Sequence, residues 1–156
     1  MSTKPKPIPE GYTAVTPYLI IKGAARAIDF YQRVFGATEV LRIPGPGEQV
    51  MHAEILIGGS HNMLADEFPH MGALSPHTIG GTPVFLHLYV PDADAMFAAA
   101  VAAGAKAEQP MEIKFYGDRS GTVLDPFGHR WTISTHVEDV SPEEIGRRLA
   151  AMGHAA

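Results

Sequence analysis

One order of elements occurs twice along the chain, and this repeat limits the fold more than any other feature. A run of β-branched and aromatic residues at 16–21 reappears at 85–90, about 69 positions later. Each run leads into a stretch of helical character, and a glycine ends each helix, Gly36 in the first copy and Gly104 in the second. The repeat predicts two similar modules, each of which begins with a strand and a helix.

Hydrophobic periodicity predicts the other elements. Strands are expected at 13–21, 38–43, 49–57, 62–65, 85–90, 121–124 and 130–134, and helices at 24–35 and 93–103. A last helix should start at Ser141, because Pro142 follows it and Glu144 stands three positions on. The resulting divisions are an extended arm at 1–12, modules at 13–66 and 83–136, a connector at 67–82, and a C-terminal helix and tail at 137–156.

Charge and residue content exclude several classes of function. The 156 residues carry a net charge of −5 and no Lys/Arg cluster, so nucleic-acid binding is not expected. The chain has no cysteine, which excludes disulfides, thiolate nucleophiles and Cys-ligated zinc. No run approaches the roughly 18 apolar residues of a membrane span, and residues 2–7 lack the apolar core of a signal peptide. We expect a cytoplasmic protein with no membrane partner.

The stretch at 116–131 brings turn residues, charges and aromatic residues close together. It contains Tyr116-Gly117-Asp118-Arg119 and, after a short strand, Asp125-Pro126-Phe127-Gly128-His129-Arg130-Trp131. The Asp-Pro-Phe-Gly part is a turn, because proline presets one dihedral angle and glycine supplies a positive φ. Together the two strings resemble the vicinal-oxygen-chelate superfamily of glyoxalase and bleomycin-resistance proteins, and within it a bacterial glyoxalase-like subgroup.

This resemblance implies a fold and a place for a ligand. The fold is α+β: two tandem βαβββ modules form a curled mixed β-sheet cup, and a C-terminal helix is added. A small molecule would bind inside the cup, and a homodimer is expected from the resemblance alone.

Alternation along the strands indicates which side chains face that ligand. On the strand at 85–90, Leu86, Leu88 and Val90 form an apolar row suited to packing under helices. The opposite row, Phe85, His87 and Tyr89, is typical of a cavity wall. By the repeat offset Tyr18 corresponds to His87, and His52 and Glu54 share one face of their strand. We therefore expect a pocket that mixes aromatic and ionisable groups.

The metal site of the resembled family is predicted to be lost. Its metal-using members carry His or Glu at four symmetric positions, which in this sequence hold Thr16 or Pro17, Phe85, Met63 or Ala65, and Thr132. None of these is a good ligand for zinc, nickel or iron. A shifted site built from His52, Glu54 and His87 is an alternative, and a simple hydrogen-bonded His–Glu pair is another.

Other polar residues have both a functional and a structural interpretation. Next to Tyr116, Arg119 could clamp an anionic or carbonyl-bearing ligand with Asp118 positioning it, or the two could form an ion pair that fixes a loop. Trp131 is expected in the core. Asp66 and Glu67 could supply an acid to the cavity, but we expect them as carboxylates of an exposed turn. Six further histidines are expected to be solvated: His61, His70, His77, His129, His136 and His154.

Three functions follow from these observations. The first is a protein without a cofactor that binds a small amphipathic or aromatic molecule through Tyr18, Phe85, Tyr89 and Tyr116. The second is a glyoxalase-like lyase or isomerase in which a divalent metal polarises the substrate and Glu54 moves a proton. The third is a structural or regulatory dimer. The side chains found at the metal positions favour the first of these three functions.

Overall fold

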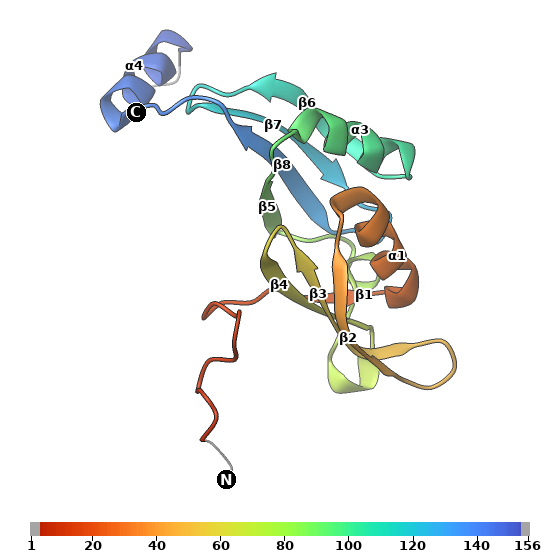
Figure 1. The fold of residues 1–156 in the computed structure, drawn as a ribbon. Helices are drawn as coiled ribbons and strands as arrows, with labels where there is room; N and C mark the ends of the chain where they lie inside the picture. The colour runs from red at the N-terminus through yellow and green to blue at the C-terminus, as the bar shows by residue number, and fades with distance from the viewer. Residues whose placement is uncertain (1–3, 154–156) are drawn as a thin grey trace. The chain divides into compact units, whose positions relative to one another are not determined.

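The computed structural model describes residues 4–153 and divides the chain into two units, unit 1 up to Thr82 and unit 2 from Pro83. Each unit contains one four-stranded mixed sheet with a helix on one face, as the ribbon in Figure 1 shows. The α+β fold with two βαβββ modules and a C-terminal helix is therefore confirmed, and neither sheet closes into a barrel. No helix among residues 4–153 is long and apolar enough to cross a membrane.

Unit 1 has the strand order β1-β4-β3-β2. Its strands are β1 (Tyr18–Ile21), β2 (Thr38–Pro44), β3 (Val50–Ile57) and β4 (Ser60–Asp66). β1 runs parallel to β4, and the other neighbours are antiparallel. The crossover that this parallel pair requires runs through helix α1 (Ala24–Phe35) and then β2 and β3.

The core of unit 1 lies between α1 and one face of the sheet. Ile28, Tyr31 and other apolar positions at helical spacing are buried on α1, while Ile55 and Leu64 are buried on the sheet. Gly36 ends α1 in the left-handed conformation, as the sequence predicts. The predicted bounds of this helix are confirmed.

Unit 2 repeats the arrangement, with the order β5-β8-β7-β6. Its elements are β5 (Phe85–Tyr89), α3 (Ala93–Ala102), β6 (Lys106–Ile113), β7 (Asp118–Leu124) and β8 (Arg130–His136). The predicted core position of Trp131 is confirmed: it is buried, and its indole N–H donates to Asp125 at 2.9 Å. Asp125 also accepts from the backbone of Phe127 and His129, so one carboxylate fixes both the turn and the indole.

The connector has more structure than its lack of periodicity predicts. It contains the short helices η1 (Pro69–Met71) and α2 (Pro76–Ile79). Glu67 accepts from the Ser75 backbone at 2.9 Å and from the Thr78 hydroxyl. Hydrogen bonding from the Ser75 side chain, and then from the Ser75 backbone and the Thr78 side chain, lowers the pKa of Glu67 to about 2. Glu67 is thus a structural carboxylate of the loop.

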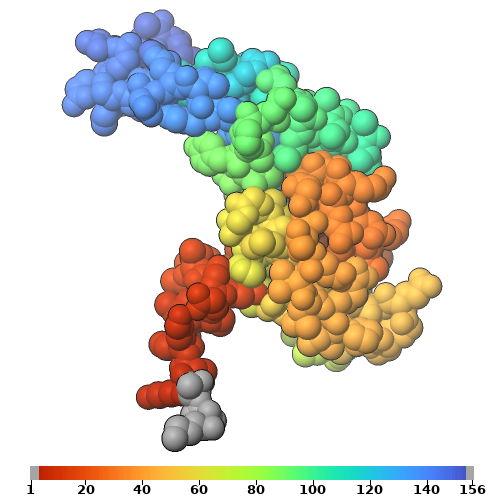
Figure 2. Space-filling view, in the orientation of Figure 1, coloured from red at the N-terminus to blue at the C-terminus, as the bar shows by residue number. Residues whose placement is uncertain are grey.

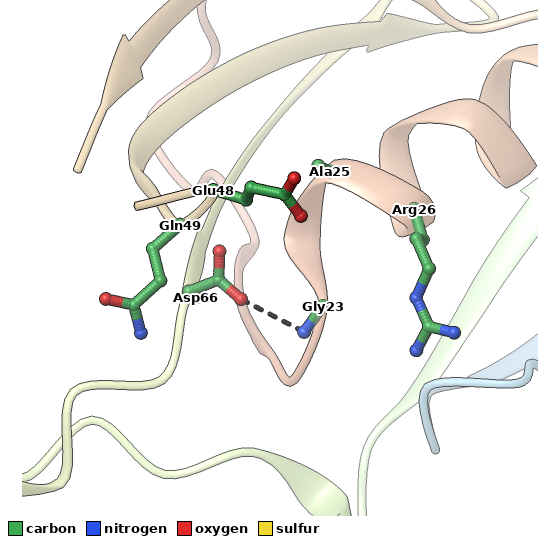
Figure 3. A pocket seen from close by; sticks show the side chains of 6 residues that line it. All are labelled: Gly23, Ala25, Arg26, Glu48, Gln49 and Asp66. Carbon is green, nitrogen blue, oxygen red and sulfur yellow. Dashed lines mark hydrogen bonds between the residues drawn. The ribbon is translucent and has the colours of Figure 1, made fainter. Parts of the chain in front are cut away.

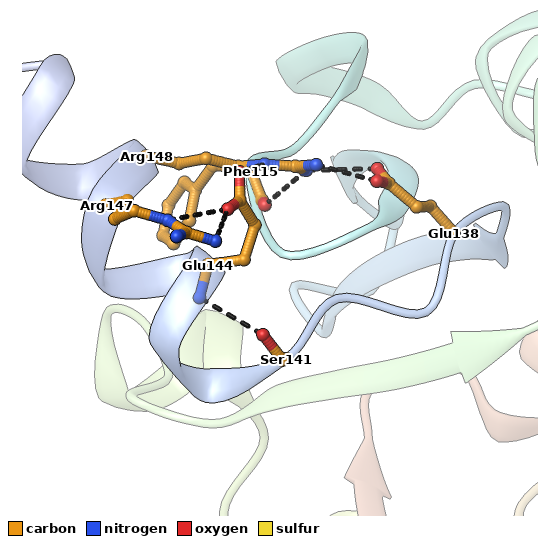
Figure 4. A network of polar contacts seen from close by, with 6 residues as sticks. All are labelled: Phe115, Glu138, Ser141, Glu144, Arg147 and Arg148. Atoms are coloured by element: carbon orange, nitrogen blue, oxygen red, sulfur yellow. Dashed lines mark hydrogen bonds and ion pairs between the residues drawn. The ribbon is translucent and has the colours of Figure 1, made fainter.

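The C-terminal helix α4 (Pro142–Ala151) is held by polar contacts, since none of its described residues is buried. Its predicted cap is confirmed, with the Glu144 N–H donating to the Ser141 hydroxyl at 3.2 Å. Arg148 donates to the Phe115 carbonyl at 3.1 Å and to the Glu138 carboxylate at 2.6 and 3.0 Å, as Figure 4 shows. Arg148 therefore ties α4 to the segments on either side of β7 and β8.

Candidate functional site

Each sheet has a face that no helix of its own unit covers. In unit 2, β5 alternates strictly, with Leu86 and Leu88 partly buried and the residues between them exposed. Phe85 and Tyr89 are 54% and 58% exposed, and Tyr18 of unit 1 is 46% exposed. Large aromatic side chains at these levels of exposure mark surfaces suited to binding. We call these surfaces the open faces of unit 1 and unit 2.

The open face of unit 1 carries a chain of hydrogen bonds that ends at a carboxylate. The Tyr18 hydroxyl lies 2.8 Å from His52 Nδ1, and His52 Nε2 lies 3.4 Å from Glu54 Oε1. A carboxylate only accepts, so a neutral His52 donates to Glu54 through Nε2 and accepts from Tyr18 at Nδ1. The structure thus brings together three residues that the sequence selects, as a hydrogen-bonded set.

The N-terminal arm adds a fourth residue to this set. The ring of Tyr12 stacks on His61 with 4.0 Å between the ring centroids. Burial, followed by the neighbouring Glu54 carboxylate, raises the pKa of Tyr12 to about 12. The geometry between Tyr12 and Glu54 falls short of a formed hydrogen bond, and the Tyr12 hydroxyl has no partner among the described residues. The Tyr12 hydroxyl and the Glu54 carboxylate are therefore neighbours that are not hydrogen-bonded to each other. Burial and the same carboxylate also raise the pKa of Tyr18.

The open face of unit 2 is organised around Asp118, which is 2% exposed. Its Oδ2 accepts from the Tyr89 hydroxyl at 2.7 Å, and its Oδ1 lies 2.8 Å from His136 Nδ1. His136 Nε2 lies 2.8 Å from Asp139. Because both partners of the imidazole are acceptors, both ring nitrogens donate, and the ring is an imidazolium. These two hydrogen bonds raise the pKa of His136.

His87 joins the same cluster from β5. Its ring stacks on Tyr89, with 4.7 Å between the ring centroids, and its Nε2 lies 2.8 Å from the Ser134 hydroxyl. The same nitrogen is 3.9 Å from Asp118 Oδ2. Ser134 is completely buried, so this Ser–His contact does not form an accessible nucleophile.

Small hydroxyl side chains cover the middle of the unit 2 face. Thr122 and Thr132 are paired across β7 and β8 and share a hydrogen bond of 3.0 Å. Ser120 is 1% exposed, and its hydroxyl has no partner among residues 4–153. Buried polar atoms are nearly always paired in folded proteins. The Ser120 hydroxyl is therefore an unused hydrogen-bonding group two register positions from the Asp118–His136 pair.

The structure explains the Tyr116-Gly117-Asp118-Arg119 string by steric constraints and by the faces to which its side chains point. Gly117 has φ +101°, and a Cβ there would lie 2.0 Å from the Glu138 carbonyl oxygen, so only glycine fits. This turn starts β7 at Asp118, opposite His136. Arg119 points to the other face and donates to Asp94 on α3 at 2.6 and 2.7 Å. Asp118 and Arg119 are thus not paired with each other, and Arg119 does not lie on the open face.

Two further predicted residues lie at the borders of the unit 2 face. Tyr116 stands in the turn before β7, and its charge contributes to a raised pKa of Tyr89, whose first cause is the hydrogen bond to Asp118. Phe85 carries the Arg130 guanidinium 5.0 Å above its ring, and Arg130 also donates to Glu108 at 2.5 Å. The Phe85 ring therefore stands beside a cation on the edge strand β5.

The side chains at the sheet centres do not fit the usual metal of the resembled family. Tyr18 lies opposite Met63 in unit 1, and His87 lies opposite Thr132 in unit 2. Only His87 among these four is a common ligand of a divalent transition metal. Within the described part of the chain, no three His, Asp or Glu residues are grouped so as to hold a metal ion. We derive no chemical step through a metal.

A hollow of about 260 Å³ at the start of α1 is a separate feature (Figure 3). It is lined by Gly23, Ala25, Arg26, Glu48, Gln49 and Asp66. Asp66 is buried, contrary to the prediction of an exposed turn, and accepts from the backbone of Gly23, Ala24 and Val50 at 2.7–3.1 Å. These bonds cap α1 and anchor β3, so the role of Asp66 is structural.

Sequence reasoning missed two histidines and Tyr12. His61 lies on β4 and not in a turn, and its Nδ1 is buried, so the prediction that it is solvated is wrong. His136 is half exposed, as predicted, but it is also hydrogen-bonded through both ring nitrogens. For His136 the signal was present: it continues the alternation of Arg130, Thr132 and Ser134. His154 lies outside the described residues. No periodic pattern marks Tyr12, because it precedes the first strand.

The chain matches the family model of the Glyoxalase/Bleomycin resistance protein/Dioxygenase superfamily over residues 12–133. It is 42% identical over 143 residues to an uncharacterized protein of Mycobacterium tuberculosis, Rv0887c, covering 90% of this chain and 84% of that protein. The crystal structure of TioX from Micromonospora sp. ML1 is similar with a TM-score of 0.62 and 29% identity, covering 83% of this chain and 100% of TioX. The fosfomycin resistance protein FosX from Listeria monocytogenes, complexed with Mn(II) and sulfate, has a TM-score of 0.60 and 18% identity over 87% of this chain and 96% of FosX.

Proposed function

Because the chain belongs to the Glyoxalase/Bleomycin resistance protein/Dioxygenase superfamily, we propose that it binds a small amphipathic or aromatic molecule without the metal site usual in that family. The superfamily includes proteins that bind and proteins that catalyse, so membership alone does not select between them. The choice depends on the side chains of the two open faces.

One observation carries the proposal. Each open face combines exposed aromatic rings with one carboxylate that is already held by hydrogen bonds: Glu54 beside His52 and Tyr18, and Asp118 beside Tyr89 and His136. Aromatic rings supply apolar contact area at a low cost in side-chain entropy, and a few fixed polar groups orient the ligand. An amphipathic molecule with a flat apolar part and a hydrogen-bonding group matches both requirements.

The side chains at the expected metal positions support a metal-independent mode. Thr16 or Pro17, Phe85, Met63 or Ala65, and Thr132 stand at the four positions where the metal-using members of the family carry His or Glu. The Mn(II) in the FosX structure belongs to a protein only 18% identical, a likeness that extends to the fold alone. We therefore propose hydrogen bonding and stacking as the means of ligand binding.

A thermal-shift screen of aromatic and amphipathic small molecules tests this proposal. Any compound that raises the melting temperature is then tested for binding to the variants Glu54→Gln and Tyr89→Phe. Each variant should bind it about tenfold more weakly, because each substitution removes one hydrogen bond that involves a charged group. Glu39→Gln is the matched control, since Glu39 is a carboxylate on the same sheet, set in β2 opposite Ile55 of the buried face. Equal binding by all three variants would contradict the proposal.

Proton transfer by Glu54 is the second candidate. The His52–Glu54 contact of 3.4 Å joins a partly buried carboxylate to an imidazole, an arrangement suited to a general base. Such a base would exchange a carbon-bound proton next to a carbonyl group. Exchange of that proton in D₂O, followed by NMR and abolished by Glu54→Gln, would favour a lyase or isomerase over a binding protein.

A further inference from the structure

We propose that the turn at residues 9–12 of the N-terminal arm (residues 4–17) is a wall of the unit 1 site, and that Tyr12 contacts the bound ligand. This inference rests on the proposed function, because it concerns the same open face. It extends that function by assigning a binding role to a segment that carries no motif and lies outside the repeated modules.

The arm is positioned by specific contacts. A backbone hydrogen bond of 3.1 Å from the Tyr12 N–H to the Pro9 carbonyl closes a turn. Within this turn Gly11 has φ +81°, and a Cβ there would lie 3.0 Å from His61 Nε2. A side chain at position 11 would therefore disturb the stack of Tyr12 on His61. In Figure 2 the arm, in red, lies beside the yellow segment around residue 60.

The stack places Tyr12 on the open face. His61 lies opposite Leu56 and Met63 lies opposite Glu54 in the β3–β4 ladder, so His61, Met63 and Glu54 share one face. That face also holds His52 and Tyr18. Tyr12, stacked on His61, therefore lies on the face that carries the Glu54 carboxylate.

Two polar atoms in this contact are left without partners. Among the described residues, neither the Tyr12 hydroxyl nor His61 Nδ1 makes a hydrogen bond, although both are shielded from solvent. Unpaired buried polar atoms cost free energy and are rare in folded proteins. A ligand with a hydroxyl, amide or amine group would satisfy them, and its flat part would pack against the rings of Tyr12 and Tyr18.

The geometry of the arm is tested first without any ligand. In the wild type, the ring current of Tyr12 should shift the His61 side-chain proton resonances upfield, as measured by ¹H–¹³C correlation NMR. Tyr12→Ala should remove this shift, whereas Val15→Ala should keep it, because Val15 is on the same arm and is 86% exposed. Unchanged His61 resonances in Tyr12→Ala would overturn the inference.

Ligand contact is tested with thioflavin T, a cationic aromatic dye whose charge complements Glu54. We expect Tyr12→Ala to raise the dissociation constant about tenfold, Tyr12→Phe to raise it less because the ring remains, and Val15→Ala to leave it unchanged. If the dye responds to Glu54→Gln and not to Tyr12→Ala, the arm inference is wrong and the proposed function stands. If the wild type does not bind the dye, the inference is overturned as stated, and the screen of neutral compounds decides the proposed function separately.

Discussion

At the scale of single residues, Asp118 has the most consequential environment in the chain. Its carboxylate is buried, accepts from the Tyr89 hydroxyl and pairs with the His136 imidazolium. Removing its charge leaves the imidazolium with one carboxylate partner, and an amide places an N–H₂ group where an acceptor is needed. This residue links the stability of unit 2 to the arrangement of its open face.

Asp118→Asn should therefore destabilise the protein, by about 2–3 kcal/mol, the usual cost of breaking a buried charged hydrogen-bond network. Urea unfolding followed by tryptophan fluorescence measures the loss, because Trp131 is buried in the core of unit 2 on β8, the strand that also carries His136. Asp139→Asn is the control. Asp139 binds the same imidazole from a fully exposed position, so its loss should cost much less stability than the loss of Asp118. Equal losses would mean that burial of Asp118 is unimportant.

The raised pKa of His136 gives stability a defined dependence on pH. The imidazolium is preferred in the folded state, so its contribution is complete below 6.5, the ordinary pKa, and disappears as pH rises through the higher folded-state value. The wild type should be more stable than His136→Gln at acidic pH, and this difference should shrink toward alkaline pH. Melting temperatures of both proteins across this range measure it. A difference that grows with pH would contradict the assignment.

At the scale of elements, the turn before β7 depends on one glycine. Gly117→Ala introduces a Cβ 2.0 Å from the Glu138 carbonyl at a φ of +101°, so the backbone must move. We expect a loss of about 3 kcal/mol or more in the free energy of unfolding. Gly146→Ala, in the middle of α4 with nothing near its Cβ position, should instead raise helix stability by about 0.5–1 kcal/mol. Chemical denaturation and circular dichroism of the pair distinguish a strained position from a free one.

The expected and the observed bounds of the helices and strands differ in ways that show which elements the sequence can predict. The bounds of α1 are correct because its apolar spacing and its glycine stop agree with the packing. The first strand was predicted from residue 13 but begins at Tyr18, since Pro17 has no N–H to donate and the preceding residues form the arm. β7 was predicted from residue 121 but begins at Asp118, because its polar residues face the open side and look like a loop in the sequence.

Candidate site residues could be predicted only where side chains alternate between the two faces of a strand. His87, Tyr89, His52 and Glu54 follow from alternation, and the structure places them on open faces. The partners that set their chemistry come from elsewhere in the chain: His136 from a strand end, Asp139 from the segment after it, and Tyr12 from the arm. These contacts depend on how distant strands pair and on where distant segments of the chain run, and no local sequence pattern encodes either.

At the scale of the whole molecule, the exposed apolar side chains of the open faces predict self-association. Ile43 and Phe85 are among the large apolar residues that are more than two-fifths exposed, and such surfaces are usually covered in solution. We propose a homodimer, with a sedimentation mass of twice the 16.8 kDa chain. Phe85→Asp should shift the mass toward one chain, whereas Glu143→Gln, an exposed change on α4, should not. A single-chain mass at high protein concentration would contradict this proposal.

Metal content tests the central claim, ligand binding without the usual metal, most directly. The protein is purified without chelator, soaked in Zn²⁺, Ni²⁺, Mn²⁺ or Fe²⁺, desalted and measured by inductively coupled plasma mass spectrometry, beside a variant with His52→Ala and His87→Ala. We predict far less than one equivalent of any metal per chain, with no difference between the two proteins. Near-stoichiometric metal in the wild type that is lost in the variant would contradict the claim and favour a metal-assisted lyase or isomerase.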